Sequence, residues 1–493
     1  MPPRRVRLSH KQKAEQLKAR RQAQQDKQSE PGGGSKASVP PSEEARLDPS
    51  HFFLRFINDS DATVARHKET AYEPFDFEHP MFQLEQQVYI SPENCPDLPR
   101  RPPGVRSMTR EQLEEAERAV FDAYFRGISP CLDSVAVEYC TFECNPNVYR
   151  HVWRVTERSQ VMCIVADARF PLAHMPVSIL RYAYANNRPV IIVLSKADLV
   201  SADDVAAWME FFKKYTTSVL GEDRAVILAC SPKELKEDGD ARQRFLEEFI
   251  TAARRLGGIS APELITVGFF GQPSVGKSSL MNGLYGKKIV SVKLTPGHTK
   301  HLQTYYMMLE GIVSGETNRS FMLCDCPGLV FPVRGSPRPL QVITGVFPLA
   351  RVREYVSPLR TLVEHFPTVR EALDDRLKLT MLWNRYPEID ERLPQSPGDY
   401  LDLFGYLWGY FVKGNTPNMH KAGLDLFRLV VEGSISYSLK PAENLEFNLE
   451  HCRDNIPQPY ADSDDNVHHD EEEGADDIDG SEGSEPSVEE CNE

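Results

Sequence analysis

The 493-residue sequence lacks any run of about 18 consecutive apolar residues, which is the length that a membrane-spanning helix requires. Its first residues, MPPRRVRLSHKQKAEQLKAR, also lack the apolar segment that defines a secretory signal. The ten cysteines are scattered, and several of them (Cys163, Cys230 and Cys324) lie in strand-like runs, where a reduced thiol behaves as a small hydrophobic group. These absences predict an intracellular protein without a membrane partner.

Positive charge is missing from the C-terminal end of the chain. Residues 461–493 contain fifteen Asp and Glu residues and no Lys or Arg, whereas residues 1–27 contain nine Lys and Arg and two acidic residues. The net charge of −15 therefore describes two oppositely charged ends and a mildly acidic body. A basic arm can contact phosphates or serve as a nuclear address; the alternative is a merely solvated, disordered end. We expect a monomer in the nucleus, nucleolus or cytoplasm, with the arm favouring the nucleus.

The sequence does contain a series of short Val- and Ile-rich runs separated by helix-like segments. Such a series is typical of a mostly parallel sheet covered by helices on both faces. The expected strands span 161–167, 190–195, 224–230, 265–270, 302–309 and 321–326. The helices expected between them span 174–186, 203–218 and 241–255. We therefore predict an α/β domain.

After about residue 336 the strands stop and the pattern becomes helical, which marks a separate C-terminal domain. Its expected helices span 348–366, 369–385, 398–413 and 418–433. Near the N-terminus, Thr109 followed by Gln112 predicts a capping box at the start of a helix. The expected segments are a basic disordered arm and linker (1–50), an N-terminal extension that wraps the body (51–139), the α/β domain (140–335), the helical domain (336–445) and an acidic disordered tail (446–493).

The strongest motif lies between an expected strand and an expected helix. It reads Gly271-Gln272-Pro273-Ser274-Val275-Gly276-Lys277-Ser278 and fits the P-loop pattern G-x-x-x-x-G-K-[ST]. The glycines let backbone N–H groups curl around phosphates, and the helix N-terminus favours an anion. Lys277 supplies charge at the β- and γ-phosphate oxygens, Ser278 ligates magnesium, and Ser279 is a further phosphate-binding candidate. The alternative is a chance glycine-rich turn.

A P-loop alone leaves ATP and GTP open, and residues 195–198 bear on that choice. Ser195-Lys196-Ala197-Asp198 ends an expected strand and resembles the guanine motif Asn-Lys-x-Asp. The Asp198 carboxylate can accept hydrogen bonds from guanine N1–H and the 2-amino group together, and the stem of Lys196 can lie over the base. Because Ser195 is shorter than Asn, we expect its contact to the P-loop to be weakened. A surface turn after a strand is the alternative.

Two more phosphate-side motifs follow the P-loop. Asp325-Cys326-Pro327-Gly328 matches D-x-x-G, in which Asp325 contacts magnesium through water and the Gly328 N–H senses the γ-phosphate. Thr299 is the candidate switch threonine, which ligates magnesium and positions the reacting groups. His298 beside it is a weaker catalytic candidate, and a loop histidine bound to a backbone carbonyl is the alternative.

In an ordinary Ras-like GTPase the phosphate motifs precede the base motifs, whereas here the base motifs come first. The base motif at 195–198 and a second base-side candidate, Ser231-Pro232, precede the phosphate motifs at 271–328. The same sheet results if the original ends are joined and the chain is cut elsewhere. With DARFP, PGHTK and DCPGLVFP, this order resembles the circularly permuted GTPases of the ribosome-assembly class.

The resemblance implies a P-loop GTPase domain in circularly permuted order at 140–335. It also implies a slow, magnesium-dependent GTPase that binds GTP and GDP and acts as a nucleotide-controlled assembly factor, with a pre-ribosomal subunit or ribosomal RNA as partner. Arg169 of the DARFP segment is expected to form a structural ion pair. The loop 325–329 leads directly into the C-terminal domain, so a γ-phosphate that orders this loop can reposition that domain.

Two positions depart from the pattern of this class. Ser274 stands where these P-loops usually have an Asn that is associated with potassium, so potassium stimulation is not expected. Leu329 stands where Ras-like proteins have the catalytic Gln, and an apolar side chain cannot orient water. Hydrolysis would then wait for a partner. The alternative is a degenerate GTPase that serves as a nucleotide-regulated binding module with little hydrolysis.

Overall fold

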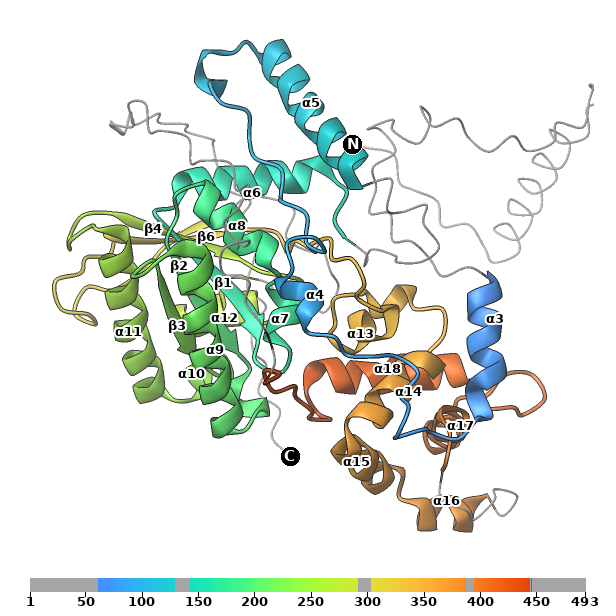
Figure 1. Cartoon of the computed structure of the whole chain (residues 1–493). Coiled ribbons are helices and arrows are strands. Elements are labelled where there is room, and N and C mark those ends of the chain that lie inside the picture. Colours follow the sequence, from blue (N-terminus) through green and yellow to red (C-terminus); the bar gives the residue numbers. More distant parts are fainter. Residues whose placement is uncertain (1–60, 129–141, 291–302, 387–393, 444, 446–493) are drawn as a thin grey trace, which may run out of the picture. The chain divides into compact units, whose positions relative to one another are not determined.

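The computed structural model describes residues 61–128, 142–290, 303–386, 394–443 and 445. A six-stranded sheet occupies the α/β part of the chain (Figure 1). Its strands are β1 (Val161–Asp167), β2 (Val190–Ser195), β3 (Ala225–Ala229), β4 (Ile265–Phe270), β5 (Gln303–Tyr306) and β6 (Phe321–Asp325). They lie in the order β3-β2-β1-β4-β6-β5, and every neighbouring pair is parallel except β5 and β6. The predicted mostly parallel sheet is confirmed.

Helices cover both faces of this sheet. Every residue of β1, β2 and β4 is buried, as expected for strands with two covered faces. On one face, side chains such as Cys163 and Phe269 pack with the helices α11 (Gly239–Gly257) and α12 (Lys277–Tyr285). On the other face, α6 (Pro146–Arg158) comes so close to β4 that a Cβ on Gly268 would lie 2.7 Å from Val155 Cγ1. A glycine is therefore required there.

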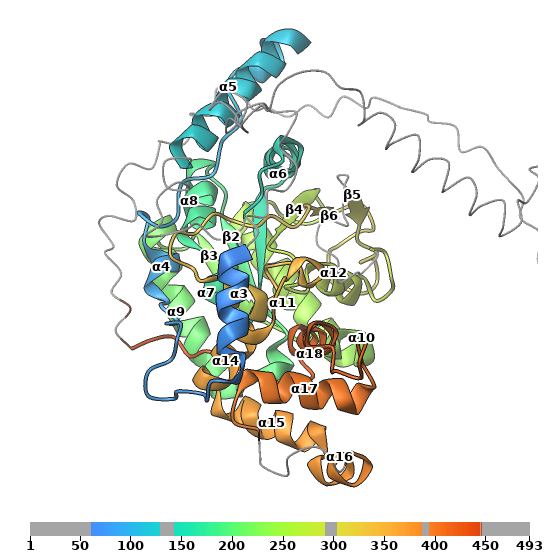
Figure 2. The same ribbon diagram turned by 90° about the vertical axis from the view of Figure 1, so that its right-hand side faces the viewer.

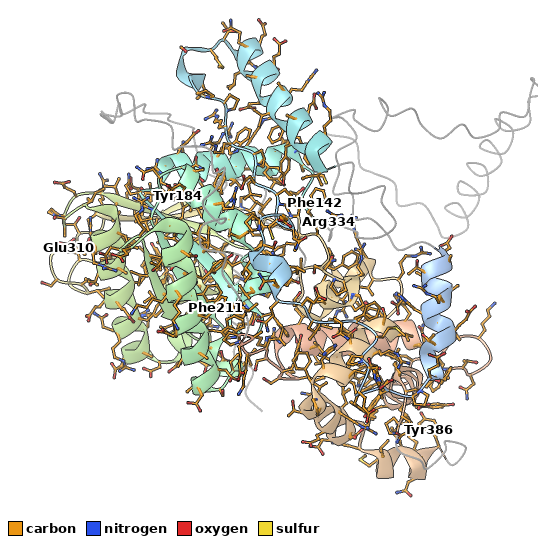
Figure 3. All side chains as sticks on the ribbon, viewed as in Figure 1. Phe142, Tyr184, Phe211, Glu310, Arg334 and Tyr386 are labelled. Atoms are coloured by element: carbon orange, nitrogen blue, oxygen red, sulfur yellow. The ribbon has the colours of Figure 1, made fainter. Side chains whose placement is uncertain are left out.

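The remaining helices of the α/β part are α7 (Pro171–His174), α8 (Val177–Ala185), α9 (Ala202–Leu220) and α10 (Glu234–Glu237). Of these, α9 agrees with the prediction for 203–218, and the short α7 and α10 were not predicted. The helix predicted at 174–186 is wrong at its start, because α8 begins only after Pro176, whose ring and missing N–H break a helix interior. Figure 3 labels Phe211 on α9, which packs against Trp208 and Tyr215.

The C-terminal region is helical, as predicted, and the two views show its helices gathered beside one another (Figures 1 and 2). They are α13 (Arg338–Ile343), α14 (Val356–His365), α15 (Pro367–Leu377), α16 (Leu379–Arg385), α17 (Pro397–Trp408) and α18 (Met419–Glu432). The prediction for 348–366 is wrong in its first half, where Pro348 leads into a short 3-10 turn. The helix predicted at 369–385 is interrupted at Lys378, whose φ is 47°.

The N-terminal segment contacts both of these regions. Its helices are α3 (Asp61–Glu69), α4 (Gln87–Ile90) and α5 (Arg110–Ile128), with short 3-10 turns at Thr70–Tyr72 and Val105–Ser107. Arg360 of α14 donates hydrogen bonds to the carbonyls of Thr70 and Glu73, at 2.9 and 2.8 Å. Trp153 of α6 donates one to the Pro99 carbonyl at 2.7 Å. The segment therefore joins the helical region to the α/β part through hydrogen bonds to its own backbone.

The helix that starts after Thr109 has the predicted capping box. Gln112 Oε1 accepts from the Thr109 N–H at 3.0 Å, and Thr109 Oγ1 accepts from the Gln112 N–H at 3.3 Å. Each side chain thus satisfies a backbone donor of the other residue.

Among the helices of the described residues, none has the length and apolar character that a membrane crossing needs.

Candidate functional site

The P-loop residues join the end of β4 to the start of α12. Because β2, β3, β4 and β6 belong to one parallel set, their carboxyl ends meet at the same edge of the sheet, where α/β proteins bind ligands. A Cβ on Gly271 would lie 2.7 Å from the Val165 carbonyl oxygen, and Gly276 has a φ of 97°. Both positions therefore require glycine. The N-terminus of α12 then points its free N–H groups toward this edge.

Lys277 and Asp325 meet at the centre of this edge. The Lys277 ammonium donates hydrogen bonds to Asp325 Oδ1 and to the Cys326 carbonyl, and both side chains are buried. The second oxygen of this carboxylate, Oδ2, is buried without a hydrogen-bond partner among the described residues. A buried carboxylate oxygen without a donor is costly, so this atom fits a metal-bound water. The partly buried Ser278, next to Lys277 on α12, carries a hydroxyl that could ligate such a metal.

The D-x-x-G loop lies directly against the P-loop. A Cβ on Gly328 would lie 3.2 Å from the Pro273 backbone nitrogen, so glycine permits this approach. The Leu329 N–H donates to the Gly271 carbonyl at 3.2 Å, and the Leu329 side chain is buried. An apolar side chain that is buried and held by its own backbone cannot position water.

The base motif contacts the P-loop through its serine. The Ser195 hydroxyl, fully buried at the end of β2, donates a hydrogen bond to the Val275 carbonyl. A Cβ on Gly276 would lie 3.0 Å from Ser195 Oγ. Serine thus does contact the P-loop, because β2 and the P-loop approach closely enough for the short hydroxyl to reach. That this contact is weaker than the one from an asparagine stays a prediction.

Lys196 is anchored by a buried carboxylate that the sequence analysis did not single out. Its ammonium lies 2.8 Å from Asp167 Oδ2, and Arg169 lies 2.8 Å from the same oxygen. Burial raises the pKa of Asp167, but Lys196 and Arg169 outweigh burial and hold it well below its usual range. Arg169 thus forms the expected structural ion pair. The sequence does contain a signal for Asp167: it is the aspartate that ends the otherwise apolar strand β1. The neighbouring strand leads directly to Lys196.

The base motif and the P-loop open on one pocket of about 560 Å³, a size typical of ligand sites. Its walls include Lys196, Asp198, Pro232, Gly276, Ser279 and Glu432. Ser231 is buried, and its hydroxyl accepts from the Glu234 N–H at 3.2 Å. Pro232 thus reaches the pocket, whereas Ser231 holds the first turn of α10.

Three other residues that the sequence singled out are Gln272, Thr299 and His298. Gln272 is buried and donates to the Ala173 carbonyl at 3.0 Å. The switch candidates Thr299 and His298 lie outside the described residues. Within the described ranges, no group of three or more His, Cys, Asp or Glu side chains is placed to hold a metal. A metal at this edge would therefore depend on hydroxyl ligands beside Asp325.

A mostly parallel sheet with a P-loop after β4, a D-x-x-G loop after β6, and a guanine-type motif that comes earlier in the chain is the arrangement of a P-loop GTPase fold in circularly permuted order. A family model described as 50S ribosome-binding GTPase matches residues 266–356. The chain is similar over most of its length to guanine nucleotide-binding protein-like 1. The relatives from Rattus norvegicus and Homo sapiens are each 29% identical to it, over 80% of this chain and 73% of theirs.

Similarity extends to a plant protein and to a solved structure. GTPase LSG1-1 of Arabidopsis thaliana is 29% identical over 70% of this chain and 68% of its own. The structure described as GNP-bound YlqF from T. maritima is 19% identical, with a TM-score of 0.36, over 58% of this chain and 94% of that one.

Proposed function

We propose that this protein binds GTP with magnesium and hydrolyses it slowly to GDP and phosphate. The observation that carries the proposal is that the Lys277–Asp325 pair and the base motif lie at the same carboxyl edge of one sheet, beyond β4, β6 and β2. One pocket is lined from both the base side and the P-loop side. A P-loop that shares a pocket with an Asn-Lys-x-Asp-like motif favours a guanine nucleotide over an adenine nucleotide.

In this proposal each group has a separate task. The N–H groups of 271–276 and the Lys277 ammonium bind the phosphates, and the exposed Asp198 carboxylate reads the guanine N1–H and 2-amino group. Ser278, Asp325 and Thr299 hold magnesium, which supplies positive charge at the β- and γ-phosphate oxygens. Among the described residues, Asp325 Oδ2 accepts no hydrogen bond, which supports this role. His298 stays a weaker catalytic candidate.

We further propose that hydrolysis is slow until a macromolecule completes the site. The burial of Leu329 supports this proposal, because no water-orienting side chain stands at that position. The match of residues 266–356 to the family model described as 50S ribosome-binding GTPase supports a pre-ribosomal subunit or its RNA as that macromolecule. The protein would then act as a nucleotide-controlled assembly factor in the nucleus, nucleolus or cytoplasm, and as a monomer.

A second candidate is a binding module that holds the nucleotide but barely hydrolyses it. The same burial of Leu329 favours this reading, and Ser274 in place of the usual asparagine adds to it. The intact Lys277, Ser278 and Asp325 favour hydrolysis instead. The two candidates differ in what a partner does to the rate.

Single-turnover hydrolysis of GTP, with and without purified ribosomal subunits, separates them. We expect the isolated protein to turn over at about 10⁻⁴–10⁻³ s⁻¹, as unassisted Ras does, and subunits to accelerate it at least about tenfold. Lys277→Ala with subunits is the control for contaminating GTPases. A rate near 1 s⁻¹ without a partner would refute the partner-dependent model. If ribosomal subunits of neither size accelerate hydrolysis, the result supports the second candidate, a binding module.

A further inference from the structure

The base-recognition loop, Lys196–Leu199, is held by a helix that lies far away in the sequence. At the C-terminal end of α18, Arg169 donates hydrogen bonds to the carbonyls of Val430 and Val431, at 2.9 and 3.1 Å. The Lys196 ammonium lies 3.5 Å from the Val431 carbonyl oxygen. The last carbonyls of a helix lack partners within the helix and attract cations. The two cations that share Asp167 therefore also bind the end of α18.

The chain just beyond α18 packs against the same loop. Gly433 has a φ of 91°, and a Cβ there would lie 2.2 Å from Leu199 Cδ1. Ser436 Oγ donates to the Leu199 carbonyl at 2.7 Å, and the Leu439 N–H donates to the Arg169 carbonyl at 2.9 Å. No gap separates Leu199 from Gly433, so a larger residue at position 433 would push Leu199 aside.

We propose that the end of α18 and the segment up to Leu439 form a positioning element of the guanine subsite. The element holds Lys196–Leu199 so that Asp198 faces the base, and Glu432 extends from it into the wall of the same pocket. This inference rests on the proposed binding of guanine nucleotides. It makes the C-terminal helical region part of base recognition, separately from any link through the D-x-x-G loop.

The chain offers a matched pair of glycines for the test. Gly433 and Gly409 are the C-cap residues of α18 and α17, and both have a positive φ. A Cβ on Gly409 would meet no atom within 4 Å. Gly409→Ala therefore carries the backbone strain of an alanine at a helix end, and Gly433→Ala carries that strain together with the collision with Leu199.

The measurement is the affinity of each full-length variant for GDP and for IDP, which lacks the 2-amino group. We expect the wild type to prefer GDP at least about tenfold, because a hydrogen bond to a charged group is lost with IDP. Gly433→Ala should lower this preference at least threefold, mainly by weakening GDP, and Gly409→Ala should leave it unchanged. Adding Leu199→Ala to Gly433→Ala should restore most of the preference, because it removes the colliding atoms.

Three outcomes would overturn the proposal. An unchanged ratio of GDP to IDP affinity in Gly433→Ala would do so, as would an equal change in Gly409→Ala. If Gly433→Ala does not fold, hydrogen–deuterium exchange of the wild type decides instead: GDP with magnesium should slow the amides of 433–439 severalfold, and unchanged exchange there would contradict the inference. A wild type that binds ADP as tightly as GDP would defeat the proposed function itself, and this is seen without any variant.

Discussion

At the scale of single residues, recognition and anchoring are divided within the base motif. Asp198 is exposed in the wall of the pocket, whereas Ser195 is fully buried and bound to the P-loop backbone. Lys196 stands between them, with its ammonium fixed by Asp167. A carboxylate that faces the pocket can thus select the base while its neighbours fix the loop that carries it.

Asp198→Asn should reverse the base preference. The amide keeps one acceptor and gains a donor, so it loses the paired bonds to guanine and suits the 2-oxo group of xanthine. We expect GTP affinity to fall about 100-fold or more, since two hydrogen bonds to a charged group are lost, while XTP affinity rises. Titration with fluorescent GTP, XTP and ATP measures this change. Equal affinity of the wild type for ATP and GTP would contradict the role given to Asp198.

Asp167→Asn should destabilise the protein, because Arg169 and Lys196 lose a buried counter-ion. The free energy of unfolding should fall by about 3–5 kcal/mol, measured by urea unfolding. The folded pKa lies below the unfolded one, so the stabilisation is complete above about pH 4 and is lost only as the pH falls further. The loss should therefore be equal at pH 7 and pH 5. Asp203→Asn, at an exposed carboxylate on α9, should change stability little.

Ser274 bears on the response to potassium. Its φ is 64°, a left-handed conformation that asparagine tolerates better than most residues, so Ser274→Asn should fold. We expect the hydrolysis rate of the wild type to change little when sodium is exchanged for potassium, whereas Ser274→Asn should acquire a potassium dependence. Parallel rate measurements in the two salts at equal ionic strength test this. A strong potassium response of the wild type would show that serine does not remove the cation site.

At the scale of elements, β4, the P-loop and α12 form one phosphate-binding unit. Lys277→Ala and Ser278→Ala should each lower GTP affinity at least about tenfold, because each removes a contact to a charged group. Circular dichroism should show that the helices and strands remain. Lys213→Ala, at an exposed lysine on α9 that does not line the pocket, is the control for a general loss of positive charge. If both P-loop variants bound GTP as tightly as the wild type does, the P-loop would not have its proposed role.

The sheet could be read from the sequence because β1, β2 and β4 are buried on both faces and are therefore continuously apolar. The edge strand β5 carries less of this signal, since most of it is exposed, and its described part is shorter than the predicted 302–309. The predicted helix ends were wrong where the backbone conformation of a single residue interrupts a helix, as it does at Lys378. The phosphate side of the site followed from local motifs. The contacts of Arg169 and Lys196 with α18 could not, because they join residues more than 200 positions apart.

At the scale of the whole molecule, the permuted order places the D-x-x-G loop next to the helical region. After Gly328 the chain passes directly to α13, where the Thr344 carbonyl lies 3.1 Å from His174 Nε2 of α7. A Cβ on Gly345 would lie 3.0 Å from Val431 Cγ1 on α18 and 3.6 Å from Ser274 Cβ. Gly345, just after α13, therefore lies in contact with both the P-loop and the last helix.

A γ-phosphate bound by the Gly328 N–H should therefore order the whole segment from Gly328 to Gly345. We expect a non-hydrolysable GTP analogue with magnesium to slow amide hydrogen exchange over 329–345 at least threefold more than GDP does. Gly328→Ala should abolish the difference, because its Cβ would lie 3.2 Å from the Pro273 nitrogen and would push the loop away from the phosphate. Gly239→Ala, at a glycine that also lacks a positive φ and whose Cβ would meet no atom within 4 Å, is the matched control and should retain the difference. Equal exchange with GDP and the analogue in the wild type would separate nucleotide state from the helical region, and the permuted order would then have no part in signalling to a partner.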